Sequence, residues 1–227
     1  MNTFALHVFV RDPTRDVFRM RLKAKLGAGA RDQIRNAAER CFAGGGFCGT
    51  SINDIAAATK FTKPTIYYHF GSKLGLFNEI LACAHDECFA RMQAAAQKSQ
   101  RIEAQLEEIL GSLFEFFQDR QDLTRLAFAA AFSAPKDSPR ETHAACRKTR
   151  NFEFFHELVR RGQREGVLDA SFDSRTLAYG IYGALSFHLM ANVILPGTKL
   201  DRRTAKEVVR LFFQGAAAKP TRRNSPR

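Results

Sequence analysis

The residues from 62 to 73 carry side chains suited to contacting a nucleic acid. This stretch, TKPTIYYHFGSK, places hydroxyls, cations and two adjacent tyrosines close together. Threonine and lysine suit base edges and phosphates, tyrosine hydroxyls suit phosphate oxygens, and the free N–H groups at a helix start attract phosphate. The candidate DNA contacts are Ser51, Thr62, Lys63, Pro64, Thr65, Tyr67, Tyr68, His69 and Lys73.

Two short helices joined by a tight turn must position these side chains. Ser51 is a favourable N-cap, and Asp54 follows three residues later as a shorter version of the Glu or Gln of a capping box. Ile52, Ile55 and Ala56 supply an apolar side. The pattern predicts a first helix over residues 52–58.

The second helix presents most of the candidate contacts. Thr62 can cap it, and Pro64 falls in its first turn, where a missing N–H costs nothing. Ile66 and Phe70 are four residues apart and should face inward, while Gly71 ends the helix. Because so short a helix is marginal alone, we expect it to pack against helices over residues 30–43 and 72–96. Such a unit would present its second short helix to a major groove.

The run GFCGTSINDIAAATKFTKPTIYYHFGSK resembles the N-terminal DNA-binding domain of the TetR/AcrR family of bacterial transcriptional regulators. The similarity covers about residues 31–80. It rests on the entry from Gly46 to Ser51, on Asp54-Ile55-Ala56, Thr62, Tyr67, His69-Phe70 and Ser72-Lys73. It implies that Thr62, Lys63, Thr65, Tyr67 and Lys73 contact DNA and that Ile66 and Phe70 are packing residues.

One position departs from the family pattern. The family usually has glycine in the turn between the two short helices, and this chain has Lys60. If the turn keeps a positive φ there, a residue other than glycine costs roughly 1 kcal/mol. The departure concerns the geometry of the turn and not the fold.

The rest of the chain has the apolar spacing of helices, and strand signals are essentially absent. Helices are predicted over residues 102–118, 123–133, 141–165, 173–195 and 201–217. We therefore expect an all-α fold, in which an N-terminal three-helix helix-turn-helix domain is joined by a long helix to a larger helical ligand-binding and dimerisation domain. The expected divisions are a basic N-terminal extension (1–29), the helix-turn-helix domain (30–78), an effector-binding and dimerisation domain (79–217) and a disordered basic tail (218–227).

The larger domain offers two further candidate surfaces. The resemblance implies an effector pocket, and aromatic and polar residues could line it for an apolar or aromatic molecule: Phe114, Phe117, Phe128, Phe132, His143, Phe152, Phe155, His156, Tyr179 and Tyr182. It also implies a homodimer formed through the last two long helices. The candidate interface is Gly180, Ala184, His188, Val208, Leu211, Phe212 and Gly215. Packing inside a single chain is the alternative for both sets.

The charge of the chain is concentrated at its two ends. The net charge is +12. Residues 1–73 hold 12 Lys and Arg against 5 Asp and Glu, a net +7; residues 74–198 hold 14 against 16; residues 199–227 hold 9 against 2, again +7. A basic head on a near-neutral body fits a DNA-binding domain, although two solvated basic tails would give the same balance.

Other classes of site have little support in the sequence. There is no uninterrupted run of about 18 apolar residues and no leader pattern, so we expect no membrane span and a cytoplasmic location. No nucleophile elbow or phosphate-binding loop occurs, which argues against an enzyme, and no cofactor is expected. His143 with Cys146 and His156 forms only a weak metal pattern. A redox pair of Cys83 and Cys88 is a remote alternative.

The sequence therefore predicts a sequence-specific DNA-binding transcriptional regulator, a repressor released by a small apolar or aromatic effector. Its expected partners are a pseudo-palindromic double-stranded operator, that effector and a second copy of the chain. The alternatives are a non-specific basic DNA-binding or scaffold protein and an all-helical enzyme of small molecules.

Overall fold

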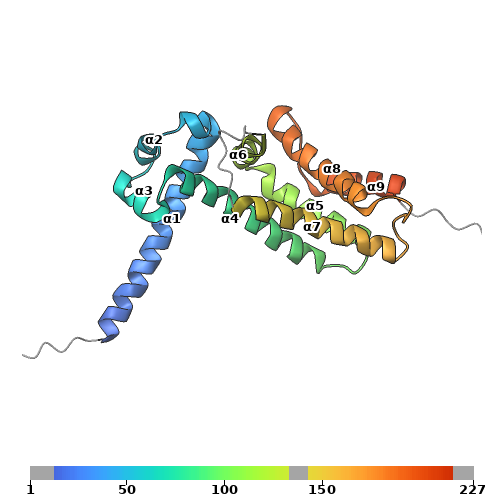
Figure 1. Ribbon diagram of the computed structural model, residues 1–227, viewed down its shortest axis with the longest axis horizontal. Helices are drawn as coiled ribbons and strands as arrows, with labels where there is room; N and C mark the ends of the chain where they lie inside the picture. Colours follow the sequence, from blue (N-terminus) through green and yellow to red (C-terminus); the bar gives the residue numbers. More distant parts are fainter. Residues whose placement is uncertain (1–12, 133–142, 217–227) are drawn as a thin grey trace, which may run out of the picture.

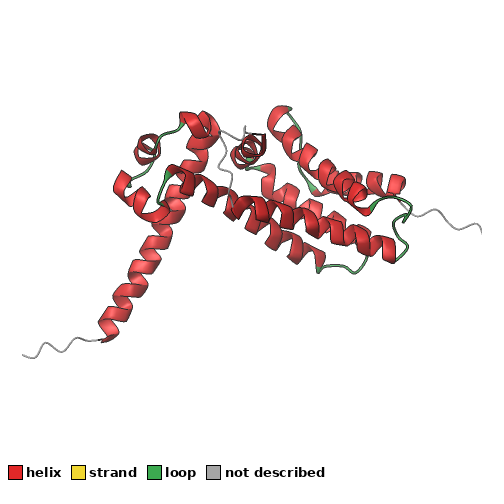
Figure 2. Cartoon of the chain, in the orientation of Figure 1, coloured by secondary structure: helices red, strands yellow, loops and turns green. Residues whose placement is uncertain are grey.

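The computed structural model describes residues 13–132 and 143–216. Throughout these ranges the regular secondary-structure elements are α-helices (Figure 2). They are α1 Pro13–Gly49, α2 Ile52–Ala57, α3 Lys63–Phe70, α4 Lys73–Ala96, α5 Ile102–Gln118, α6 Gln121–Phe132, α7 His143–Arg164, α8 Ser174–Ile194 and α9 Arg202–Ala216. The predicted all-α class is confirmed. From α2 to α9, the expected ends agree with the observed ends within two residues.

The first helix differs from its prediction. We expected it over residues 30–43, but α1 begins at Pro13 and continues to Gly49, with a break where Gly46 has φ 69° and ψ 174°. Residues 13–29 therefore continue the helix, and no structural break occurs at the expected boundary between residues 29 and 30. Pro13 suits a first helical position. Figure 1 shows this half of α1 projecting from the rest of the chain. Residues 1–12 and the tail 218–227 lie outside the described ranges.

The DNA-binding unit consists of α1, α2, α3 and the start of α4, grouped at one end of the molecule (Figure 1). Its buried side chains are Ile34, Ala38, Phe42, Ile52, Ile55, Ile66, Phe70, Leu76 and Phe77. Phe47, in the glycine-rich end of α1, lies edge-on to Phe77 with ring centroids 5.0 Å apart. Phe47 is partly buried and packs against this small core.

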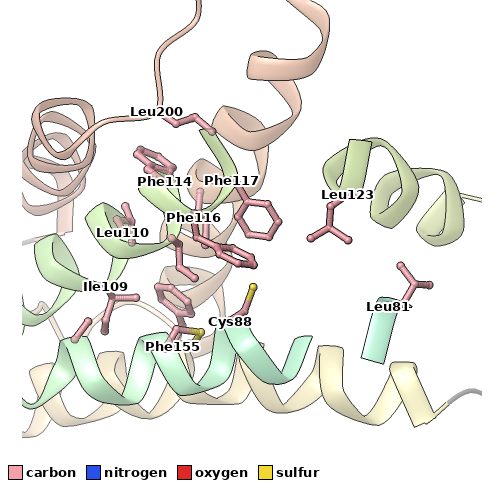
Figure 3. Close-up of a cluster of buried hydrophobic side chains, with 14 of the residues drawn as sticks. Leu81, Cys88, Ile109, Leu110, Phe114, Phe116, Phe117, Leu123, Phe155 and Leu200 are labelled. Atoms are coloured by element: carbon pink, nitrogen blue, oxygen red, sulfur yellow. The ribbon is translucent and has the colours of Figure 1, made fainter. Parts of the chain in front are cut away.

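The body is built around α5. This helix packs against α9, α4 and, less extensively, α6, α7 and α8, while α7 lies between α4 and α8. Figure 3 shows the result: phenylalanines of α5 meet Cys88 of α4, Phe155 of α7 and Leu200 before α9. The helix α4 contributes buried side chains to both cores, from Leu76 near its start to Ala95 near its end. It is therefore the rigid connection between the two parts.

One described helix, α8, is long and apolar enough to cross a membrane when judged by length and composition alone. The sequence has no uninterrupted apolar run of that length. The mean hydropathy of α8 is high enough although serine, glycine, tyrosine and histidine interrupt it. Core helices of soluble proteins pass the same test. In this fold Leu177, Ile181 and Leu185 of α8 are buried against neighbouring helices.

Candidate nucleic-acid interface

A full capping box fixes the start of α2. The Ser51 hydroxyl accepts a hydrogen bond from the Asp54 backbone N–H at 3.2 Å, and the Asp54 carboxylate accepts from the Ser51 backbone N–H at 2.8 Å. The predicted pairing is confirmed. The carboxylate also accepts from the Ser51 hydroxyl at 2.7 Å, and the two bonds that it accepts, first the one from the Ser51 N–H, lower the pKa of Asp54 because they stabilise its charged form. Ser51, which is a candidate DNA contact, already uses its hydroxyl in this cap.

The turn between α2 and α3 accommodates Lys60 without backbone strain. Among the described residues, no amino acid other than glycine has a positive φ, so Lys60 does not carry the cost considered above. The Thr59 hydroxyl accepts a hydrogen bond from the Phe61 N–H at 3.1 Å and so bridges the turn. A side-chain hydrogen bond thus stabilises a turn that this family usually closes with glycine.

The recognition helix α3 buries one side and exposes the other. Ile66 and Phe70 are buried, as expected. Tyr67 is 49% exposed and Tyr68 is 85% exposed. Lys63 at the helix start is also exposed. A helix that leaves two tyrosines and a lysine uncovered presents both apolar area and hydrogen-bonding groups to an external partner.

The two threonines at the start of α3 contact each other. The hydroxyls of Thr62 and Thr65 lie 3.0 Å apart, and Thr62 is the N-cap residue but makes no side-chain capping bond. The expected cap of α3 is therefore wrong in this detail. The first N–H groups of α3 have no partner from that cap and remain candidates for binding phosphate oxygens.

Two candidate contacts are partly engaged within the protein. Lys73 Nζ donates to the carbonyl oxygens of Phe47 and Thr50, at 2.8 and 3.0 Å, and lies 4.4 Å from the centroid of the Phe47 ring. One of its three donors remains for a phosphate. His69 is half-buried between Tyr68 and Phe70, with ring centroids 5.3 and 6.1 Å away. Both residues help to hold the unit together.

Glycines shape the connection from α3 to α4. Gly71 has φ 72°, which favours glycine. A Cβ atom at Gly75 would lie 2.1 Å from the carbonyl oxygen of Phe70, so only glycine allows the first turn of α4 to approach the end of α3. The sequence analysis did not single out Gly75. A glycine in the first turn after the Ser72 cap was the available signal.

The charge around α3 favours a polyanion. Between Asp54 and Glu79 the chain has no acidic residue, whereas Lys60, Lys63 and Lys73 fall in that interval. The exposed side of α3, which we call the reading side, therefore repels phosphate less than the body does, because the body carries acidic as well as basic side chains. This distribution matches the electrostatic requirement for a DNA-binding surface.

Residues 34–80, which span this unit, match the model of the bacterial regulatory proteins of the tetR family. This unit is therefore a DNA-binding domain of the TetR type. The chain is 25% identical over 202 residues to an uncharacterised HTH-type transcriptional regulator, YdgC, from Bacillus subtilis, covering 87% of this chain and 97% of YdgC. It is 28% identical over 93 residues to IcaR, an HTH-type negative transcriptional regulator of the biofilm operon from Staphylococcus aureus, covering 40% of this chain and 48% of IcaR.

The similarity of fold extends beyond this unit into the body. The transcriptional regulator FadR from B. subtilis, solved in complex with stearoyl-CoA, superposes with a TM-score of 0.69 at 15% identity, covering 81% of this chain and 97% of FadR. The chain is thus a DNA-binding transcriptional regulator and not an enzyme. The two relatives and the solved structure with a similar fold are all named as transcriptional regulators.

In the body, several of the predicted effector residues lie close together. The Phe152 ring centroid is 4.8 Å from that of Tyr179, 5.6 Å from that of Tyr182 and 6.2 Å from that of His156. Phe155 joins them, 5.4 Å from Tyr182. These rings fill the space between α7 and α8.

The other predicted effector residues are dispersed. Phe114 is fully buried and Phe117 is 8% exposed, both in the core on α5. Phe128 stacks on Phe132 of α6, whose side chain is 80% exposed. His143 begins α7, but its side chain lies outside the described part of the chain. None of the four phenylalanines borders the cavity at the end of α4.

A cavity of about 420 Å³ lies instead where the end of α4 meets α5 and α7. Its lining shares no residue with the predicted set: Gln93, Ala96, Gln97, Gln100, Gln105, Phe154, Glu157, Leu158 and Arg161. Gln105 is buried, donates to the carbonyl oxygens of Ala96 and Ser99 at 2.7 Å, and accepts from Arg161. This cavity was not predicted, because its lining comes from the end of α4, from α5 and from α7, which are far apart in the sequence.

The predicted dimer residues divide between interior and surface. Val208 is buried, and the Phe212 ring packs beside Gly180, which nevertheless stays exposed, so Val208 and Phe212 help to pack α9 onto α8 within one chain. His188 donates from Nδ1 to the Ala184 carbonyl at 2.7 Å. Leu211 is 72% exposed, and Gly215 is also exposed.

A neighbouring stripe on α8 was missed. Tyr179, Phe187 and Ile194 are each 57–59% exposed, and Gly183 lies between the first two with no atom within 4 Å of where its Cβ would be. We call these residues the α8 stripe. Their spacing of four, four and seven residues places them along one side of the helix.

The weaker alternatives find no support among the described residues. No group of three or more potential metal ligands occurs in them. The side chains of His143 and Cys146 lie outside the description. Burial raises the pKa of Cys88 to about 12, which keeps it a thiol and makes it a poor redox partner for Cys83.

Proposed function

We propose that this protein is a homodimeric repressor that binds a pseudo-palindromic operator through α3 and leaves it when a small apolar or aromatic molecule occupies the body. The observation that carries the proposal is the outward side of α3, where Tyr67, Tyr68 and Lys63 are exposed and no acidic residue is near in sequence. IcaR, which resembles this chain over 93 residues, is a negative regulator.

We assign roles within the interface by chemistry. The hydroxyls of Tyr67 and Tyr68 and the remaining donor of Lys73 contact phosphates, as does the start of α3. Lys63 and Thr65 reach base edges. The remaining candidates shape or border the contact: Ser51, Thr62, Pro64 and His69.

A dimer follows from the size of α3. Eight residues read only a few base pairs, so two copies must bind successive major grooves about 34–36 Å apart to define a site. The α8 stripe and Leu211 supply an uncovered apolar surface on the last two helices. Pairing of that surface about a two-fold axis also accounts for the apolar composition of α8, which packing within one chain covers only in part.

The effector site is assigned to the cavity between α4, α5 and α7. Phe154, Leu158 and Ala96 offer apolar contacts, and Arg161 offers a cation at the rim. The molecule bound by FadR, stearoyl-CoA, combines an apolar chain with anionic groups. The cavity adjoins the last turns of α4, so an occupant that moves this end also moves the connection to α3.

Selection of bound fragments from the source genome tests DNA recognition. Purified protein should enrich a small set of fragments sharing an inverted repeat, and should retain a large affinity ratio between that repeat and random duplex. Enrichment without a shared sequence, together with a steep salt dependence, would instead identify a non-specific basic DNA-binding protein.

Release of the selected operator tests the effector site. Stearoyl-CoA and a set of aromatic carboxylates serve as probes, with displacement of labelled operator as the readout. Filling the cavity by Gln97→Trp should abolish the response to any active probe, whereas Ala94→Trp, on an exposed position of α4 outside the cavity, should not. Equal responses in both variants would place the effector elsewhere.

A further inference from the structure

Arg31, on α1, contacts two other helices of the DNA-binding unit at once. Its Nε donates to Glu79 Oε1 on α4 at 2.6 Å, and its Nη2 donates to Glu79 Oε2. Its Nη1 donates to the backbone carbonyl of His69 at 2.7 Å. The guanidinium carbon also lies 4.9 Å from the centroid of the Phe70 ring.

The His69 carbonyl belongs to the last turn of α3, where carbonyl groups lack partners within the helix. A cation there also opposes the negative end of the helix dipole. The Arg31 guanidinium is planar, so its donors to His69 and to Glu79 have a fixed relative direction. The angle between α3 and α4 is therefore coupled to a single rigid group on α1.

We propose that Arg31 is a positioning residue for operator recognition: it fixes α3 relative to α4, and so sets the alignment of the reading side in the groove, without touching DNA. This inference rests on the proposed DNA-binding function. It assigns to α1 an active part in specificity, and it gives movement of α4 a direct connection to the end of α3 through Glu79.

The exposure of the Arg31–Glu79 ion pair distinguishes a positioning role from a contribution to folding stability. The Arg31 side chain is 41% exposed and that of Glu79 is 23% exposed, so solvent screens the ion pair and its loss should change folding little. Misalignment of α3 affects base contacts much more than phosphate contacts, because base readout depends on fixed hydrogen-bond geometry. A positioning role therefore predicts lost specificity in a folded protein.

The test compares Arg31→Lys with wild type on the selected operator and on random duplex. Lysine keeps the charge, but its single nitrogen cannot reproduce the planar fork. We expect about tenfold weaker operator binding, nearly unchanged binding to random duplex and an unchanged salt slope. Arg35→Lys is the matched control, because Arg35 lies one turn further along α1 and its guanidinium bonds to Asp32 at 2.9 Å and to Cys83 Sγ on α4 at 3.7 Å rather than to α3.

Each other outcome overturns the inference. Because lysine keeps the charge, Arg31→Gln tests the alternative of a phosphate contact: a salt slope reduced by about one in that variant would make Arg31 a phosphate contact. Equal losses on both DNAs, or losses that parallel a lower melting temperature, would make it merely structural. Unchanged operator binding would give it no role. Wild-type protein that shows no operator preference would instead contradict the proposed function, so the two failures are distinguishable.

Discussion

The DNA-binding unit and the body share α4 but are stabilised by different kinds of contact. The unit uses directional contacts at defined positions, such as the Ser51 and Asp54 box, the carbonyl bonds of Lys73 and the close approach at Gly75. The body uses broad apolar packing around α5 and retains a cavity. Directional contacts allow a rigid unit to move only as a whole, whereas the body has space in which a ligand can change the packing.

Breaking the closest approach in the unit should have the largest effect. Gly75→Ala places a Cβ atom 2.1 Å from the Phe70 carbonyl oxygen, so α3 and α4 must separate. We expect a loss of about 3 kcal/mol in the stability of the DNA-binding unit, at the upper end for overpacking, and loss of operator binding. Thermal unfolding and operator titration measure both.

The control for that variant is Gly44→Ala. Gly44 lies in α1 with no atom within 4 Å of where its Cβ would be, so alanine should be neutral or slightly stabilising. If both alanine variants behave alike, the packing of α3 against α4 is not specified by Gly75.

A charge introduced into the α8 stripe should weaken the dimer. Phe187 is 57% exposed in the single chain, so Phe187→Glu should leave the fold intact but cost about 2 kcal/mol or more of dimer stability. Sedimentation should then show monomers, with weakened operator binding. Ser171→Glu, in the exposed segment before α8, is the control. A dimer that survives Phe187→Glu would contradict the assigned surface.

Removing an exposed tyrosine should have a moderate effect. Tyr67→Ala should weaken binding to every sequence by about 1 kcal/mol, roughly fivefold, because it removes a phosphate contact and leaves the dimer intact. Replacing Lys63 or Thr65 should instead change which operator positions matter. An unaltered base preference after those replacements would show that the reading side has been placed wrongly.

Lowering the pH should have the smallest effect on stability, and this effect should appear in both the DNA-binding unit and the body. Hydrogen bonds lower the pKa of Asp54 at the start of α2 and of Asp173 at the start of α8. A carboxyl whose folded pKa is lowered stabilises the protein above its unfolded pKa, and loses that contribution as the pH falls through the folded value. We therefore expect stability to decline below about pH 4.

Asparagine variants of the two caps check this dependence. Asp54→Asn and Asp173→Asn should each flatten the decline slightly, as measured by thermal unfolding between pH 3 and pH 6. An unchanged slope in both variants would show that other carboxyl groups, such as Glu108 bonded to Lys98 and Arg202, dominate the acid response.

The same contrast explains what the sequence could predict. Caps, breaking glycines and helical periods are local signals, so α2 to α9 were placed within about two residues and the exposed side of α3 was identified. The start of α1 at Pro13 was not predicted, because the prediction of this helix rested on its apolar spacing alone. Arg31 and Glu79 are 48 positions apart, and no local pattern connects them.

Predictions for the body depended on which side chains meet after folding. Phe114 and Phe155 proved to be core residues, and the cavity proved to be lined largely by glutamines. On α8 the exposed residues include Gly180 of the predicted interface and also Tyr179, Gly183 and Phe187, which that prediction did not contain. A shift of one position turns a helix by about 100°, which a sequence pattern alone does not resolve.

The central claim is that two copies of α3 read a specific duplex through their exposed side. The most direct measurement is the ratio of affinities for the selected inverted repeat and for random duplex of equal length, at one fixed salt concentration. We expect a ratio of about a thousand or more. A ratio near one would contradict sequence-specific recognition by this helix.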